Sequence, residues 1–139
     1  MPRAGQASET GHMAHPRTYS DKDPYLKQLR KVCLKFPESS EVEAWGRPTF
    51  RAGQKIFAVF GGPDEKTQTS YCLIFKPDPE DRAALVQDDR FFAPQYWGPG
   101  GWLGLDFDAA KVDWEEVWEL CDASYRQVAL KRMIKALDG

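Results

Sequence analysis

A series of short β-like segments between Glu41 and Lys76 constrains the fold of this chain more than any other feature. Turn signals that contain glycine separate four segments, which cover residues 42–45, 48–51, 55–60 and 70–75. Parallel strands need crossover connections of about a dozen residues or more, whereas antiparallel strands can be joined directly by turns. The spacing therefore predicts a four-strand antiparallel meander.

Helical patterns lie on both sides of this meander. Asp23 and Pro24 supply an N-cap and a first-turn proline before apolar residues at helical spacing, and Pro37 ends that run. The opposite side of this helix is basic, which predicts an amphipathic helix packed against a core. After the meander, Asp78 caps a second, short helix over residues 79–87.

Two further elements follow in the C-terminal half. Residues 96–97 and 102–107 predict a hairpin, joined by a glycine-rich turn whose Pro-Gly pair suits a type II geometry. Asp113 caps a long helix, with Glu116 three residues later as the partner of a capping box. The apolar stripe of this helix changes phase near Ala129, which predicts a kink or a separate last helix.

These elements predict a single α+β domain in residues 18–139 of the 139-residue chain. The expected architecture is an antiparallel sheet of about five strands with helices packed on one face, which leaves the other face at least partly open. Residues 1–17 are mostly small and polar, with proline and glycine. This composition predicts a disordered N-terminal tail or an added extension.

The compartment follows from apolar runs and cysteines. No segment approaches the roughly 18 consecutive apolar residues of a membrane helix, and the N-terminus lacks the apolar part of a secretory signal. Cys33, Cys72 and Cys121 are odd in number, and each lies in an apolar segment, as is typical of buried thiols. We therefore expect a cytoplasmic protein in a reducing environment, without a membrane partner.

The positions of histidine and cysteine disfavour an enzyme. Both histidines, His12 and His15, lie in the predicted tail, so the folded domain lacks the commonest general base and metal ligand. The three cysteines are far apart in the sequence, with no histidine nearby, which disfavours a zinc site or an activated thiolate. We expect no enzymatic activity, no metal and no cofactor.

A net charge of −2 conceals an uneven distribution of charge along the chain. Basic residues concentrate in the first helix, in segment 47–55 and near the C-terminal end, and aromatic residues flank the basic segment. Two basic groups that meet in the folded protein would form a patch suited to phosphate contacts with stacking. The alternative is a set of ordinary solvated helix faces with aromatic residues in the sheet core.

Several short motifs, beginning with EAWGRPTFR, follow one another along the chain. They comprise residues 43–51, 55–58, 89–92, 96–98, 101–105, 124–126 and 131–132. In this order they make the chain, from about Tyr25 to Leu137, resemble the MmcQ/YjbR-like family. The resemblance implies a small bacterial α+β protein, of a kind commonly labelled DNA-binding because its shape is similar to a double-wing domain that presents a concave sheet to DNA.

The charge pattern and the resemblance indicate the same candidate surface. Arg47, Thr49 and Arg51 alternate onto one face of a strand, and Lys76 and Trp102 belong to neighbouring strands. The candidate nucleic-acid-binding residues are the cations of this face and three basic residues at its rim: Arg47, Arg51, Lys76, Arg126, Lys131 and Arg132. We expect this surface to bind DNA weakly, through its phosphates.

A different class of function is also open. The aromatic loop Tyr96–Trp102 could serve a protein-interaction or small-ligand-binding module as its main contact. Exposed aromatic side chains in this loop would favour that function, and buried ones would leave it without support.

Overall fold

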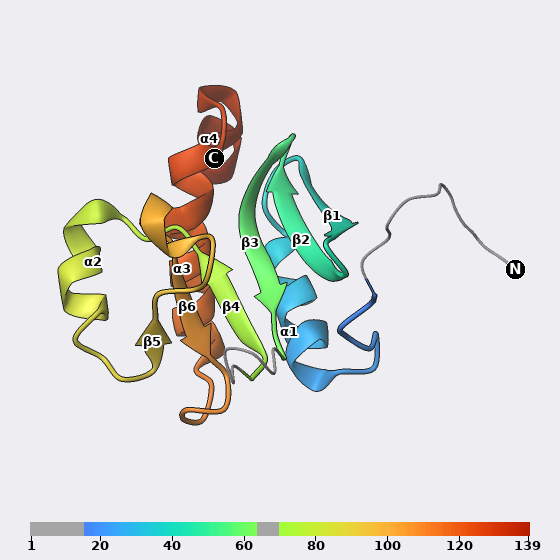
Figure 1. The fold of residues 1–139 in the computed structure, drawn as a ribbon. Helices are drawn as coiled ribbons and strands as arrows, with labels where there is room; N and C mark the ends of the chain where they lie inside the picture. The colour runs from blue at the N-terminus through green and yellow to red at the C-terminus, as the bar shows by residue number, and fades with distance from the viewer. Residues whose placement is uncertain (1–15, 64–69) are drawn as a thin grey trace, which may run out of the picture.

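The computed structural model describes residues 16–63 and 70–139, which form one antiparallel sheet with helices against it (Figure 1). In sheet order the strands are β1 (Ser39–Ala44), β2 (Arg47–Ala52), β3 (Lys55–Gly61), β4 (Cys72–Phe75), β6 (Leu103–Asp106) and β5 (Phe91–Phe92). The helices are α1 (Pro24–Cys33), α2 (Pro79–Leu85), α3 (Trp114–Val128) and α4 (Lys131–Asp138). The α+β class and the meander are confirmed; the described sheet has six strands instead of about five.

The N-terminal boundary lies close to the start of the described chain. Of the predicted tail, residues 1–15 lie outside the described residues. Arg17 forms an ion pair with Glu43 of β1, with 3.1 Å between Nε and Oε1. The backbone N–H of Thr18 donates to the carbonyl of Gly46 (2.9 Å), so the chain is already attached to the β1–β2 hairpin here. Among the described helices, none is both long and apolar enough to cross a membrane.

The helix boundaries follow from the capping residues that the sequence predicts. The Asp23 carboxylate accepts hydrogen bonds from the backbone N–H groups of Tyr25 (2.8 Å) and Leu26 (3.1 Å), and so begins α1. Asp113 caps α3 in the same way. The chain is extended at Ala129, between α3 and α4, which confirms the predicted break.

The predicted capping-box role of Glu116 is wrong. Its carboxylate accepts two hydrogen bonds from the guanidinium of Arg90 (2.7 and 3.1 Å), and the same guanidinium also donates to Asp88 (2.7 Å). Arginine offers a charged, bidentate partner, whereas the N-cap residue offers a single backbone donor. The side chain of Glu116 therefore ties the turn before β5 to α3.

The predicted hairpin before β6 is wrong in its first strand. Residues 96–97 are not extended; the strand that pairs with β6 is β5, Phe91-Phe92. Pro94 and Pro99 have no N–H group and cannot continue a ladder, and a 3-10 turn, η1 (Gly98–Gly100), replaces the predicted type II turn. Residues 93–102 instead form a loop, which crosses in front of the sheet in Figure 1.

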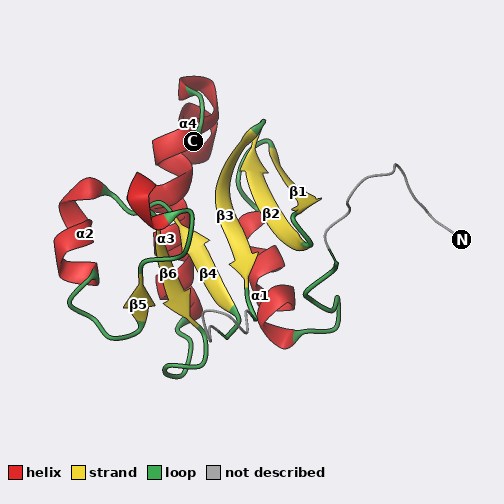
Figure 2. Ribbon diagram, viewed as in Figure 1, coloured by secondary structure: helices red, strands yellow, loops and turns green. Residues whose placement is uncertain are grey.

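Helices α1 and α3 cover one face of the sheet and form the main core with it (Figure 2). Tyr125 of α3 lies at the centre, where its ring stacks on Phe36 (4.9 Å between centroids) and meets Phe57 of β3 edge-on (5.3 Å). The Tyr125 hydroxyl donates to the carbonyl of Pro37 (2.7 Å). The buried ring is thus both packed and hydrogen-bonded.

The outer face of the sheet, opposite α1 and α3, carries a second, smaller hydrophobic cluster. Val59, Cys72 and Ile74 form this cluster, and Trp97 and Trp102 at the ends of the 93–102 loop pack against it. The predicted open face is therefore covered at its centre by two indole rings. Only its margins are left for contact with another molecule.

Candidate functional site

The strand register determines which side chains share the outer face. Thr49 pairs with Val59, and Val59 pairs with Ile74, so one row of side chains crosses β2, β3 and β4. Arg47 lies two residues before Thr49 on β2, and Arg51 lies two residues after it. Because side chains alternate along a strand, both arginines belong to this face, as the sequence predicts.

Thr49 organises the neighbouring side chains on β2. It is fully buried, and its hydroxyl donates to the carbonyl of Val42 on β1 (2.5 Å). The same hydroxyl accepts a hydrogen bond from Nε of Arg51 (3.3 Å). A guanidinium has five N–H donors, and this bond uses one of them while it holds the group near the sheet.

Lys76 directly follows β4, and its backbone is fixed from the helical side. Its N–H donates to Oγ of Ser124 in α3 (2.9 Å), and the Ser124 hydroxyl donates to the carbonyl of Phe57 on β3 (2.6 Å). The alternation that directs Cys72 and Ile74 to the outer face directs the Lys76 side chain there as well. Helix α3 thus holds the backbone of Lys76 in place from one face of the sheet, while the Lys76 side chain lies on the other face.

These outer-face cations (Arg47, Arg51 and Lys76) have no carboxylate partner within residues 16–63 and 70–139. Each is half-buried, so each has lost part of its contact with water. Five arginines elsewhere in the described chain do form ion pairs: Arg17, Arg30, Arg90, Arg126 and Arg132. The outer-face cations therefore have no described counter-charge within the protein and are available to an external anion.

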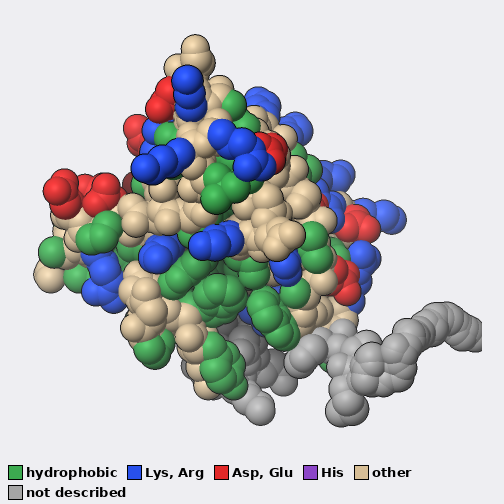
Figure 3. All heavy atoms as spheres, turned by 90° about the horizontal axis from the view of Figure 1, so that it is seen from above, with side chains coloured by type: hydrophobic (Ala, Val, Ile, Leu, Met, Phe, Trp, Pro, Cys, Tyr) green, Lys and Arg blue, Asp and Glu red, His purple; other side chains and the backbone are tan. Residues whose placement is uncertain are grey.

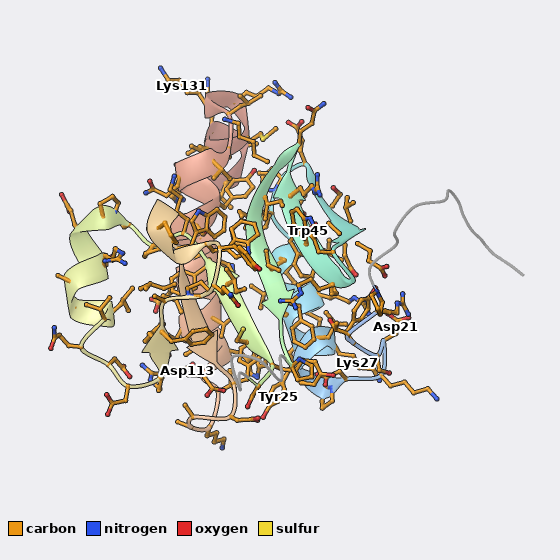
Figure 4. All side chains as sticks on the ribbon, viewed as in Figure 1. Asp21, Tyr25, Lys27, Trp45, Asp113 and Lys131 are labelled. Atoms are coloured by element: carbon orange, nitrogen blue, oxygen red, sulfur yellow. The ribbon has the colours of Figure 1, made fainter. Side chains whose placement is uncertain are left out.

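The three C-terminal basic residues differ from the outer-face cations. Arg126 binds Asp122 (3.2 Å) and Asp138 (2.5 Å), because α4 folds back along the end of α3. Arg132 binds Glu38, with 2.9 Å between Nη2 and Oε1. Lys131 lies at the tip of α4, far from Trp45 in Figure 4. The two rim arginines, Arg126 and Arg132, are thus paired with acidic side chains of the protein itself.

Three tryptophans form a chain beside the outer-face cations. Trp45, in the turn between β1 and β2, meets Trp97 edge-on, with 6.0 Å between centroids and 79° between the rings. Trp97 in turn contacts Trp102 at 4.8 Å. Trp97 and Trp102 are half-buried, whereas Trp45 is 52% exposed. Figure 4 shows Trp45 on the side of the sheet formed by β1 and β2.

Tyr96, next to Trp97, is 88% exposed, the most exposed of the large hydrophobic side chains in the described chain. Both Tyr96 (φ 70°) and Trp45 (φ 55°) occupy the left-handed backbone region. Bulky residues rarely adopt this conformation, because it brings Cβ close to the following carbonyl oxygen. Two strained backbone positions therefore carry aromatic side chains next to Trp97: Tyr96 precedes it in the sequence, and Trp45 contacts its ring.

Sequence reasoning missed one basic residue near this surface. Arg82 of α2 donates from Nε to the carbonyl of Gly101 (3.3 Å), and so joins α2 to the loop that carries Trp97 and Trp102. No motif marks this residue in the sequence. Its position results from the way α2 folds back toward the loop, which only the three-dimensional structure reveals.

Charge is distributed unevenly over the surface. Figure 3, which looks down on the molecule from the α4 end, shows Lys and Arg side chains over and around a hydrophobic area, with acidic side chains mainly toward the periphery. A pocket of about 410 Å³ between α2 and α3 has the opposite character, because four acids line it: Asp78, Asp81, Glu116 and Glu119. An anionic ligand would be attracted to the basic area seen in Figure 3 and repelled by the acidic pocket between α2 and α3.

Cys33, Cys72 and Cys121 are all buried and carry free thiols. Burial raises the pKa of Cys72 to about 12, an effect that the nearby charge of Arg47 only partly offsets. Cys33 and Cys121 are 3.9 Å apart between sulfur atoms in the main core, and burial raises the pKa of Cys33 well above its ordinary value. The described residues contain no group of three or more His, Cys, Asp or Glu side chains that could hold a metal ion.

The chain was compared with family models, with curated proteins and with solved structures. A family model described as YjbR matches residues 34–127. A crystal structure of a Deinococcus radiodurans protein with a DUF419 domain is similar in fold, with a TM-score of 0.60 and 24% sequence identity over 81% of this chain and 87% of that one. A search of curated proteins found no match.

Proposed function

The chain belongs to the YjbR family, and from this premise we propose that it is a DNA-binding protein that acts by binding and not by catalysis. In this proposal the outer-face cations contact DNA phosphates. The single observation that carries it is the contrast between half-buried cations without a described carboxylate partner and the neutralised arginines elsewhere. A phosphate oxygen would supply the missing counter-charge.

The geometry favours contacts to the backbone over sequence readout. Arg47 and Arg51 are four residues apart on β2, which corresponds to about 13 Å along an extended strand. Cations spaced along a sheet face can follow successive phosphates, whereas base-edge readout requires an element that enters a groove. We therefore expect modest affinity, little sequence preference and strong dependence on salt.

The test is a salt titration of binding with a matched pair of variants. A labelled duplex of mixed sequence is titrated with the wild-type protein, with Arg47→Gln/Arg51→Gln and with Arg126→Gln/Arg132→Gln, and binding is followed by fluorescence anisotropy. Both variants lose the same net charge, but only the first removes outer-face cations. Circular dichroism and urea unfolding establish that each variant is folded.

The expected result separates local contacts from a general charge effect. The outer-face variant should reduce the slope of log affinity against log salt by about 1.8, since each neutralised phosphate contributes about 0.9. The control variant should keep the wild-type slope. Absence of wild-type binding at low salt, both to this duplex and to a single strand of the same sequence, would refute the proposal, and so would an equal loss in both variants.

A second candidate function rests on Tyr96. An aromatic side chain that is 88% exposed in a strained loop is typical of a contact with a protein or a small ligand. Such a ligand would perturb the indole N–H signals of Trp97 and Trp102 in a nitrogen–proton NMR spectrum, and Tyr96→Ala would abolish that perturbation. Perturbation that survives Tyr96→Ala would refute this candidate.

A further inference from the structure

The turn between β1 and β2 carries an unusual residue. Ala44 pairs with Arg47, so Trp45 and Gly46 alone form the loop, and both have positive φ (55° and 78°). Two-residue hairpin loops of this kind favour Asn-Gly or Gly-Gly, which adopt positive φ at little cost. Tryptophan in the first position stores strain in the backbone, and strain of this kind is concentrated at functional sites.

Packing within the protein does not account for the tryptophan. The Trp45 side chain is 52% exposed, although an indole gains most from burial. Its described aromatic contact is the edge-on one with Trp97, which orients the ring without covering it. The turn therefore presents a large, oriented aromatic surface to the solvent.

The surroundings of Trp45 indicate which ligand this surface suits. Arg47 follows two residues later on the outer face, and Arg51 lies further along the same strand without a described carboxylate partner. An exposed aromatic ring beside cations that follow a strand is the arrangement with which proteins bind single-stranded nucleic acid, where bases stack and phosphates lie alongside. In a duplex the bases are already paired and stacked, so their faces are not accessible to an indole.

Resting on the proposed DNA-binding function, we infer that the preferred ligand is single-stranded DNA, with an unpaired base stacked on Trp45 and phosphates on the outer-face cations. Stacking on an aromatic ring is tolerant of sequence, because every base has a π-face. The preference for single strands should therefore not depend on one nucleotide sequence.

The decisive variant is Trp45→Asn. It creates the Asn-Gly pair that the turn prefers, so the hairpin keeps its shape while the indole is lost. Trp45→Phe retains an aromatic ring, and Trp118→Leu removes another exposed tryptophan, 42% exposed on α3, as a matched control. Unfolding in urea establishes that each variant is folded.

Each protein is titrated with oligo(dT) and with a duplex of equal charge, over a range of salt. At high salt, the wild-type protein should bind oligo(dT) more tightly than the duplex. Binding of oligo(dT) should also quench tryptophan fluorescence. Trp45→Asn should weaken oligo(dT) binding about five- to a hundredfold, without a change in the salt slope. Trp45→Phe should recover part of the affinity, and Trp118→Leu should bind like wild type.

The outcomes distinguish this inference from the proposed function. Equal binding of both DNAs, or oligo(dT) binding unaffected by Trp45→Asn, would overturn the inference, while the salt-dependent role of Arg47 and Arg51 would stand. Absence of salt-dependent binding to either DNA would overturn both.

Discussion

Replacement of Ser124 by alanine tests the connection between α3 and the sheet that holds the backbone of Lys76. The Ser124 hydroxyl is fully buried, accepts from the Lys76 N–H at 2.9 Å and donates to the Phe57 carbonyl at 2.6 Å. Ser124→Ala removes both bonds and deprives two backbone groups of this partner. An unsatisfied buried group costs about 1–3 kcal/mol, so for two groups we expect the free energy of unfolding to fall by about 2–6 kcal/mol.

Equilibrium unfolding in urea measures this loss. With a denaturant slope of about 2 kcal/mol per molar, the urea midpoint should fall by about 1–3 M. The slope itself should stay constant, since the same surface is exposed on unfolding. Two-state behaviour is checked by coincident circular dichroism and fluorescence transitions.

Ser39→Ala is the matched control for this prediction. The Ser39 hydroxyl is also buried, but within the described chain it has no hydrogen-bond partner. Its removal deprives no other group of a bond and relieves a desolvated hydroxyl, so stability should stay within about 0.5 kcal/mol of wild type or rise. An equal loss in both variants would refute the reasoning, since the effect would then come from the change of side chain and not from hydrogen bonding.

Three further predictions concern the thiols, the loop-covered sheet and acid stability. With its pKa raised to about 12 by burial, Cys72 should react with a thiol reagent near neutral pH only after unfolding; rapid labelling of the native protein would contradict this. Gly104→Ala places Cβ about 2.5 Å from Cζ of Phe92 and should cost about 1–3 kcal/mol in urea unfolding, part of which Phe92→Leu should restore. Hydrogen bonds from Arg90 lower the pKa of Asp88 below its ordinary 3.8. The contribution of this ion pair to the stability of the folded protein is therefore fully present above pH 3.8 and is lost as pH falls through the lowered pKa. The difference in urea midpoint between wild type and Arg90→Gln should therefore shrink with acidification, and a constant difference would contradict the assignment.

The sequence predicted those parts of the fold that depend on local chemistry. Turn signals at short spacing predicted the meander, because tight connections leave antiparallel pairing as the available arrangement. Asp23 and Asp113 predicted helix starts because capping is decided within one turn. Residues 96–97 were mispredicted as the first strand of a hairpin, because the aromatic residues of the 93–102 loop have β propensity while its prolines prevent a ladder.

The sequence predicted only in part which basic side chains are free of acidic partners and can bind an external anion. The Arg126–Asp122 pair has i,i+4 helical spacing and is evident from the sequence. The partner of Arg132 is Glu38, which lies 94 residues away and meets it only after α4 folds toward the start of β1. Basic residues in a sequence therefore cannot be ranked as anion sites until the fold reveals which of them already have acidic partners.

The same reasoning explains why Trp45 attracts little notice in the sequence and much in the structure. The sequence predicts Trp45 as the last residue of the strand segment 42–45, whereas the observed register places it in the turn, in a backbone conformation that costs about 1–2 kcal/mol. Its edge-on contact with Trp97 returns about 0.5–1.5 kcal/mol, so Trp45→Asn should change the free energy of unfolding by no more than about 1.5 kcal/mol. A residue that contributes so little to stability, and yet exposes an indole beside cations without described partners, is better explained by what it binds than by what it stabilises.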